Sequence, residues 1–334
     1  MEALKVCPST LTAGYDTYSP VAKRKLLNNQ TVSHILPYSG LNASIEENQQ
    51  FNANRKSLSL SGAQSKFSMV IKNREFQLAA EGEQSTYILK PKLTDYAYPE
   101  FSPANEHLTM QIAEQVYGIE TASNGLCFFN NGEAAYITKR YDVAKDGTKI
   151  QQEDFASLAG VTSDNAGKFF KYDAKSYEDI ALLIQKYISA WRIEMIRYFD
   201  IILFNFLFSN GDAHLKNFSV LQTPNGDYRL APAYDLINTQ IHIPDDTIFA
   251  LRKGLFNGKE KYQTCEAING RTFLEFGKQI GISEKIVKRE LDKFCANYEQ
   301  IYTLIQNSFL SEPLKKIYRI SYKTRLETYL KTGL

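Results

Sequence analysis

The residues best suited to chemistry lie in a short polar cluster between two apolar stretches. The run Phe199–Phe208 is almost entirely apolar, and Phe218–Leu221 has the pattern of a strand. Between them the chain carries four polar side chains in quick succession: Asp212, His214, Lys216 and Asn217. Polar groups packed between buried elements are costly unless they are satisfied or have a task. The cluster therefore predicts a functional loop at 209–218.

The spacing within this cluster indicates which chemistry it could perform. Asp212 and Asn217 are five positions apart, the D-x-x-x-x-N spacing at which a kinase catalytic loop places its base and a metal-binding amide. A second acid, Asp235, follows the next predicted hairpin, where kinases carry a metal-binding Asp. Phosphoryl transfer depends mainly on positioning and charge neutralisation. The sequence thus predicts phosphoryl transfer at 209–218 and 231–236.

A lysine and a glutamate upstream fit the same chemistry. Lys90 ends the predicted strand Thr86–Lys90, and the alternation of side chains would turn it into a cleft. Glu106 lies in the first turn of a helix that Ser102 would cap and Gly118 would end. We expect a salt bridge like the kinase Lys–Glu pair. The alternatives are a solvated edge lysine and a glutamate that complements the helix dipole.

A loop of small residues at 55–66 precedes the predicted strand Phe67–Ile71. Small residues around a glycine, here Gly62, can let backbone N–H groups close over phosphate oxygens. A single glycine among serines is more often an ordinary loop. The segment therefore predicts an ATP loop only together with the other motifs.

The elements that must position these residues change character near residue 140. Strands dominate before it, including a hairpin at 125–138, and helices dominate after it, including an apolar helix from Trp191 to Phe208. The motif Ser176-x-x-Asp179 would cap another helix. We predict an α+β, two-lobed protein-kinase-like fold, with a strand-rich N-lobe at 1–140, a hinge near 138–142 and a helical C-lobe at 141–334.

The C-terminal part is predicted to be helical. An apolar stripe runs from Val287 to Ile305 after Ser283, and a last helix follows Ser311. That helix has a basic face that we expect to be solvated, made of Lys315, Lys316, Arg319, Lys323, Arg325 and Lys331.

Composition excludes several classes of protein. The 334 residues carry a net charge of +2, which gives no argument for direct nucleic-acid binding. No apolar run approaches the ~18 residues of a membrane span, and the first residues do not resemble a signal peptide. The four cysteines form no C-x-x-C pair, so a zinc ribbon is not expected. We expect a cytoplasmic protein.

Five blocks of the chain resemble the signature motifs of HipA-type serine/threonine kinases, the toxins of bacterial toxin–antitoxin systems. These blocks are Ser59–Lys66, Tyr87–Pro91, Gln152–Phe155, Gly211–Ser219 and Leu230–Leu236. The full-length HipA kinases carry an additional N-terminal subdomain that does not fit before the Ser/Gly loop. The chain therefore looks most like the short HipT form of the tripartite HipBST systems.

The resemblance implies a role for each candidate residue. Asp212 would orient the substrate hydroxyl and accept its proton, with His214 and Lys216 bracing the loop or touching the γ-phosphate. Asn217 and Asp235 would hold Mg²⁺. ATP would contact Lys90, Glu106, Ser61, Gly62, Ala63, Gln64, Lys66, Lys139, Arg140 and Tyr141. The sites of inhibitory autophosphorylation would be Ser59, Ser61 and Ser57. Lys139 stands where family members often have an acid, so Arg140 and Tyr141 fit the hinge pattern better.

The resemblance also implies partners. The expected substrate is an aminoacyl-tRNA synthetase, and the expected partners are a HipS-like small protein and a HipB-like DNA-binding antitoxin. Neither direct nucleic-acid binding nor a membrane is expected. Two alternatives stay open: a small-molecule or lipid kinase of the same superfold, and a catalytically silent corepressor in an antitoxin–DNA complex. His214 could also be a satisfied core histidine.

Overall fold

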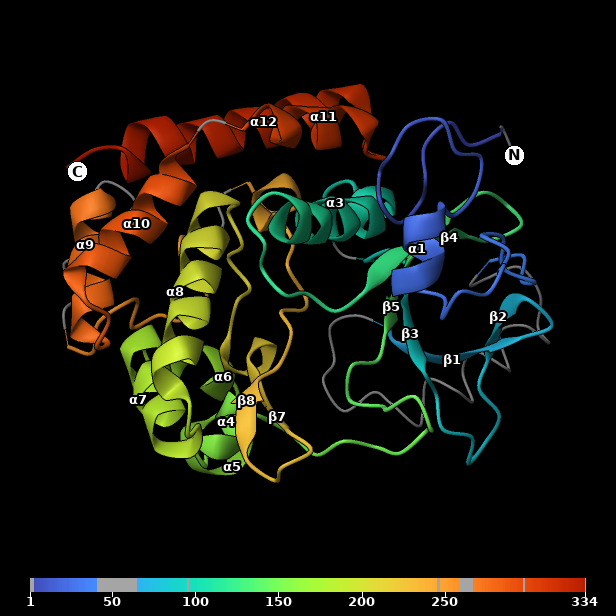
Figure 1. The fold of residues 1–334 in the computed structure, drawn as a ribbon. Helices are drawn as coiled ribbons and strands as arrows, with labels where there is room; N and C mark the ends of the chain where they lie inside the picture. The colour runs from blue at the N-terminus through green and yellow to red at the C-terminus, as the bar shows by residue number, and fades with distance from the viewer. Residues whose placement is uncertain are drawn as a thin grey trace. The chain divides into compact units, whose positions relative to one another are not determined.

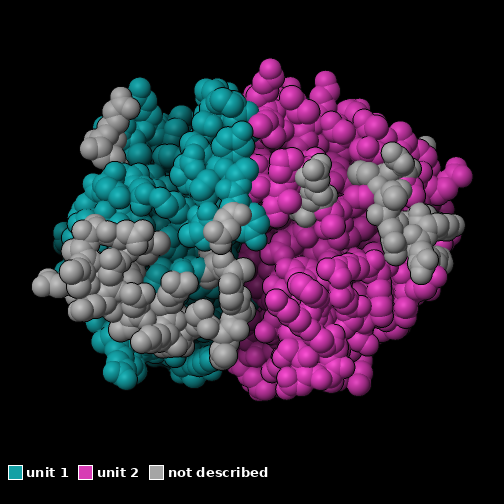
Figure 2. All heavy atoms as spheres, turned by 180° about the vertical axis from the view of Figure 1, so that it is seen from behind, with its two compact units in different colours: residues 1–112, 122–149, 300–315 teal, residues 113–121, 150–299, 316–334 magenta. Residues whose placement is uncertain are grey.

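The computed structural model describes residues 3–40, 65–94, 96–244, 247–258, 267–296 and 298–333 (Figure 1). The chain forms two compact units, each built from several segments (Figure 2). The first unit contains residues 1–112, 122–149 and 300–315, and the second contains 113–121, 150–299 and 316–334. The lobe limits drawn from the sequence at residues 140 and 141 stay a prediction.

The first unit is organised around an antiparallel sheet, which has five strands in the described part of the chain. Their spatial order is β2-β1-β3-β5-β4. The strands are β1 (Phe67–Lys72), β2 (Glu75–Leu78), β3 (Tyr87–Lys90), β4 (Asn124–Phe128) and β5 (Ala134–Lys139). Among the described residues, the helices that precede β4 are α1 (Pro20–Lys25), the 3₁₀ turn η1 (Pro99–Phe101) and α3 (Ser102–Gln115). β3 pairs with β5 so that Lys90 lies opposite Tyr136.

The N-terminal residues, which are weakly patterned in sequence, contribute to the core of this sheet. Cys7, Leu26 and Leu36 are fully buried in one cluster with Phe76 and other side chains of β1 to β3. The Tyr87 hydroxyl on β3 donates a hydrogen bond of 2.8 Å to the carbonyl oxygen of Leu26. Burial of apolar side chains contributes most of the stabilisation here. The segment is therefore a structural part of the unit.

The second unit is mainly helical, with a small antiparallel sheet of order β6-β7-β8. The strands are β6 (Gln152–Asp154), β7 (Ser219–Gln222) and β8 (Tyr228–Leu230). The helices before β7 are α4 (Phe155–Leu158), α5 (Ser163–Ala166), α6 (Phe170–Asp173), α7 (Tyr177–Tyr187), α8 (Trp191–Leu207) and the 3₁₀ turn η2 (Leu215–Asn217). After β8 come η3 (Thr239–Ile241), α9 (Gly270–Gln279) and α10 (Glu284–Cys295).

Several predicted elements are confirmed. α8 is buried along most of its length, as its apolar sequence predicts. Ser176 caps α7 in a reciprocal capping box with Asp179. Both predicted hairpins are present, as β4–β5 and β7–β8. The described residues include no helix long and apolar enough to cross a bilayer.

Three local predictions are wrong. Ser102 is not the N-cap of α3, because η1 leads directly into the helix; its hydroxyl instead accepts a hydrogen bond from Leu93 N–H. The stripe from Val287 to Ile305 is not one helix, since α10 ends at Cys295 and the next residue, Ala296, has an extended ψ of 146°. The chain resumes as α11 (Glu299–Asn307) and α12 (Glu312–Thr324), followed by a π-helical turn, Arg325–Leu330. Arg325 is not on a solvated face but buried.

Candidate active site

The predicted catalytic loop begins at a strained residue that three side chains hold in place. Ser209 follows α8 with a φ of 52°, in the left-handed region that residues other than glycine rarely adopt. The Thr239 hydroxyl donates to the Ser209 carbonyl at 3.0 Å, and Arg325 Nε donates to the Ser209 hydroxyl at 3.3 Å. The Ser321 hydroxyl lies 2.9 Å from the same oxygen. These contacts stabilise the turn that opens the loop.

The next residues are fixed by hydrogen bonds from the surrounding helices. Asn210 donates to the Asn205 side chain on α8 at 2.9 Å and accepts from Asp212 N–H at 3.2 Å. The Tyr177 hydroxyl on α7 donates to the Ala213 carbonyl at 2.9 Å. The backbone around Asp212 is thereby held, while its carboxylate stays accessible with 53% of the side chain exposed.

The two predicted metal ligands lie together. Asn217 Nδ2 approaches Asp235 Oδ2 at 3.4 Å, and Asn217 Oδ1 accepts from His214 N–H at 3.3 Å. Asp235 has a φ of 56°, a conformation that Asp tolerates better than most residues. Both side chains line a small cavity of about 20 Å³, enough space for roughly one water molecule.

The donor set of this pair suits a hard divalent cation. Carboxylate and amide oxygens are the ligands Mg²⁺ prefers, and it is usually held by one or two carboxylates together with substrate phosphates. Within the part of the chain that the structure describes, no cluster of three His, Cys, Asp or Glu side chains could hold a metal by itself. Asn217 and Asp235 therefore fit Mg²⁺ bound in company with phosphate.

Of the other two residues in the predicted catalytic loop, His214 lies near Asp212 and Lys216 lies near Asp154. His214 is buried, its ring meets the Tyr172 ring edge-on at 5.0 Å, and its Nε2 lies 4.0 Å from Asp212 Oδ1. Lys216 Nζ lies 4.0 Å from a carboxylate oxygen of Asp154 in the predicted Gln152–Phe155 block. The bracing role predicted for both residues agrees with these contacts and stays a prediction.

The salt bridge predicted between Lys90 and Glu106 is present in the first unit. Lys90 Nζ lies 2.7 Å from Glu106 Oε1, and the two side chains are only 4% and 5% exposed. The Lys90 ammonium also lies 5.4 Å from the centre of the Tyr136 ring. Because desolvation of two charges offsets much of their attraction, a buried ion pair is weak evidence for a purely stabilising role.

The remaining nucleotide candidates are only partly described. Lys139 ends β5 and donates to the Asn28 side chain, and burial lowers the pKa of Lys139. Arg140 forms a two-pronged ion pair with Asp142, Tyr141 lies in the turn after β5, and Lys66 lies immediately before β1. The other predicted loop residues lie outside the described residues: Ser57, Ser59, Ser61, Gly62, Ala63 and Gln64.

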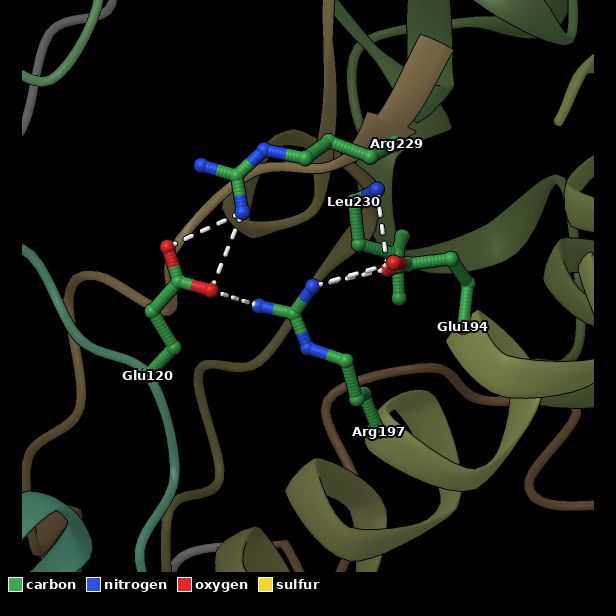
Figure 3. Close-up of polar contacts among 5 residues, drawn as sticks. All are labelled: Glu120, Glu194, Arg197, Arg229 and Leu230. Atoms are coloured by element: carbon green, nitrogen blue, oxygen red, sulfur yellow. Dashed lines mark hydrogen bonds and ion pairs between the residues drawn. The ribbon is translucent and has the colours of Figure 1, made fainter. Parts of the chain in front are cut away.

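A chain of charged side chains anchors the segment that leads to Asp235 (Figure 3). Arg229 on β8 and Arg197 on α8 both donate to the carboxylate of Glu120. Arg197 also donates to Glu194 at 3.0 Å, and Glu194 accepts the backbone N–H of Leu230 at 3.1 Å. The carbonyl of Glu120 accepts a further backbone hydrogen bond, from Ala233 at 2.8 Å. A backbone hydrogen bond at Ala233, two residues before Asp235, thus connects this segment to Glu120.

Comparison with known proteins gives the family. A profile of the HipA-like C-terminal domain matches residues 58–302. The chain belongs to the HipA-like C-terminal domain family. A protein of Haemophilus influenzae named a putative kinase is 28% identical over 326 residues, which are 92% of this chain and 91% of that protein.

Two solved structures show the fold of this HipA-like chain. HipA of Shewanella oneidensis, in a complex with HipB and operator DNA, matches with a TM-score of 0.63 at 20% identity, over 81% of this chain and 65% of that one. The Helicobacter pylori proinflammatory kinase CtkA matches with a TM-score of 0.51 at 16% identity, over 78% and 93%. The predicted α+β, protein-kinase-like fold is confirmed.

Sequence reasoning missed several side chains that hold the predicted catalytic loop of this HipA-like chain. Asn210 lies two residues before Asp212 in the predicted loop 209–218, and this position could have marked it as a residue that holds the loop. Tyr172 donates to Asp212, and Arg325 donates to Ser209, from 40 and 116 residues away. No local pattern marks such partners, because spacing along a helix tells which side is buried and not what it will contact.

Proposed function

We propose that this HipA-like chain is an ATP-dependent serine/threonine protein kinase that acts as the toxin of a bacterial toxin–antitoxin system. The observation that carries the proposal is the approach of Asn217 and Asp235 to 3.4 Å in the loop that presents an accessible Asp212. Relatives named as kinases and a kinase-like fold support the same reading. Chemistry that rests on positioning and charge neutralisation requires this kind of arrangement.

In the proposed reaction, each of these residues has a separate role in phosphoryl transfer. The Asp212 carboxylate would orient the acceptor hydroxyl and take its proton. The hydrogen bonds to the backbone around Asp212 would keep the carboxylate in the orientation that this step needs. Asn217 and Asp235 would hold Mg²⁺, which when bound neutralises charge on the phosphates. Lys90, kept in place by Glu106, would bind the α- and β-phosphates of ATP.

Regulation and partners follow from the resemblance to the short HipT form. Phosphorylation of Ser57, Ser59 or Ser61 would add about 1.5–2 negative charges to the ATP loop and repel the nucleotide phosphates. A HipS-like protein and a HipB-like antitoxin would bind the chain, a proposal supported by the complex that HipA of S. oneidensis forms with HipB and operator DNA. An aminoacyl-tRNA synthetase is the proposed substrate.

Transfer of labelled phosphate tests the proposal. Purified wild-type chain, the Asp212→Asn variant and the Asp164→Asn variant would be incubated with γ-labelled ATP, Mg²⁺ and bacterial lysate. We expect Asp212→Asn to lower transfer by about 10²–10⁴-fold, the usual contribution of a positioned general base. Asp164 lies exposed in α5 outside the site, so its variant should match the wild type.

The outcome also separates the alternatives. Label in proteins, with phosphate on serines between residues 57 and 61 by mass spectrometry, supports the kinase and its regulation. Label confined to small molecules indicates a small-molecule or lipid kinase. Binding of the antitoxin without any transfer from the wild type contradicts the proposal and favours the silent corepressor.

A further inference from the structure

Tyr172 places a hydroxyl group beside the proposed catalytic base. It lies on α6, a single helical turn, and its hydroxyl donates a hydrogen bond of 2.8 Å to Asp212 Oδ1. An alcohol in this position is what the proposed function requires of a substrate serine or threonine, since all these hydroxyls donate to a carboxylate in the same way. The Tyr172 hydroxyl therefore takes up an acceptor position on the Asp212 carboxylate that, under the proposed function, a substrate hydroxyl would use.

We propose that Tyr172 is a gate: in the free protein its hydroxyl occupies the acceptor position at Asp212, and substrate must displace it. The inference rests on the proposed function, because it takes Asp212 as the group that receives the substrate hydroxyl. It concerns a residue that none of the predicted motifs contains.

Neighbouring groups hold the Tyr172 ring in this position. The ring meets His214 edge-on with centres 5.0 Å apart, and the Lys171 ammonium lies 4.8 Å from the ring centre. Arg252 N–H donates to the Tyr172 carbonyl at 3.0 Å. The hydroxyl is thus directed at Asp212 by both its ring and its backbone.

The turn that carries Tyr172 is nevertheless held partly by surface contacts. Arg252 pairs with Asp173 at 3.1 Å, with the two side chains 62% and 39% exposed, and Lys253 donates to the Ala174 carbonyl. Exposed ion pairs stabilise little, and short surface segments open locally at low cost. α6 can therefore move without unfolding α7 or α8, whose core side chains are buried.

A gate of this kind lowers the apparent affinity for substrate without removing catalytic power. Only molecules with a displaced Tyr172 are competent, so the apparent dissociation constant rises by the inverse of their fraction. A hydrogen bond to a carboxylate that is half exposed is worth roughly a three- to tenfold change in that fraction. This range is the effect to look for.

The Tyr172→Phe variant keeps the ring against His214 and removes only the donor. The probes are hydrolysis of Mg-ATP, with water as acceptor, and phosphate transfer to casein as a general serine/threonine substrate. We expect hydrolysis to rise about three- to tenfold and the KM for casein to fall by a similar factor, with kcat not lowered. Tyr187→Phe, the same change at an exposed tyrosine that ends α7, should leave both unchanged.

Three results would separate the possibilities. A lower kcat with an unchanged KM would mean that Tyr172 positions Asp212, and the gate would be refuted. If Tyr172→Phe hydrolyses Mg-ATP and phosphorylates casein as the wild type does, the gate is refuted and the proposed function stands. No ATP turnover in any variant would defeat the proposed function itself, and the gate with it.

A stability cycle tests the contact without any activity. Thermal unfolding would be measured for the wild type, Tyr172→Phe, Asp212→Ala and the double variant. If the hydrogen bond exists in solution, the two single effects will not add, because either change removes the same contact. Strict additivity would overturn the inference.

Discussion

Breaking the ion pair between Lys90 and Glu106 should cost far more stability than breaking an exposed pair of the same length. The pair is 2.7 Å long and its side chains are 4% and 5% exposed. A Lys90→Met substitution would leave the Glu106 charge buried without its ammonium partner, which typically costs about 3–5 kcal/mol in the free energy of unfolding. The loss should be visible as a lower urea midpoint.

The same unit contains a matched control. Lys72 and Glu83 are also 2.7 Å apart, but their side chains are 44% and 30% exposed. Because water screens such pairs and the long side chains lose freedom in forming them, Lys72→Met should cost only about 0–1 kcal/mol. The chemical change is identical in the two variants, so burial is the variable that the comparison isolates.

A double substitution completes the experiment. Combining Lys90→Met with Glu106→Leu removes both charges and should recover most of the lost stability, since apolar residues of similar size often substitute for a buried ion pair at little cost. Urea unfolding followed by circular dichroism gives the free energies. If Lys90→Met costs under about 1 kcal/mol, or if the double variant is no more stable than the single, the reasoning fails. Under the proposed function, the double variant should be folded but unable to transfer phosphate.

Three further outcomes are expected. Burial raises the pKa of Asp200 to about 6, despite its ion pair with Lys293. The pKa of Asp200 is higher in the folded than in the unfolded state, so about 3 kcal/mol of stability that is present below about pH 4 is lost by about pH 6. The free energy of unfolding in urea, measured between pH 4 and 7, should therefore depend less on pH for Asp200→Asn than for the wild type. A Cβ at Gly277 would lie 2.6 Å from Val287 Cγ2, so Gly277→Ala should cost about 1–3 kcal/mol by thermal unfolding, and an unchanged midpoint would contradict this. Asp235→Asn keeps a side chain that tolerates the left-handed conformation but removes the charge; transfer of labelled phosphate should fall about 100-fold or more, and an undiminished rate would count against the metal role.

Motifs with fixed spacing made part of the site predictable. The Lys90–Glu106 salt bridge and the approach of Asn217 to Asp235 were both expected, because each pair belongs to an ordered set of parts that phosphoryl transfer requires. Their functional roles, and those of the serines before residue 65, stay predictions. The contact of Tyr172 with Asp212 was not predicted, because it depends on tertiary packing between segments 40 residues apart.

The fold was predictable where the pattern of apolar and turn residues fits one type of element, a helix or a hairpin. α8 and the two hairpins follow from apolar runs and turn residues. The interruption after α10 was missed because the stripe continues across Ala296, and the two stretches on either side belong mainly to different units. The burial of residues 3–40 was not predicted because, outside the short helix α1, their buried side chains lie in turns and extended segments that show no regular spacing.

The charged chain around β8 has a consequence for how this family can change over time. Glu120 is shared by two guanidinium groups, and Glu194 serves both Arg197 and the backbone of Leu230 (Figure 3). The Glu194 side chain is only 9% exposed, so its exchange would leave Arg197 and the buried Leu230 N–H without their acceptor, and such a change will be tolerated poorly unless a second follows. We therefore expect positions 194 and 197 to change together among homologues, while the more exposed Glu120 and Arg229 vary more freely.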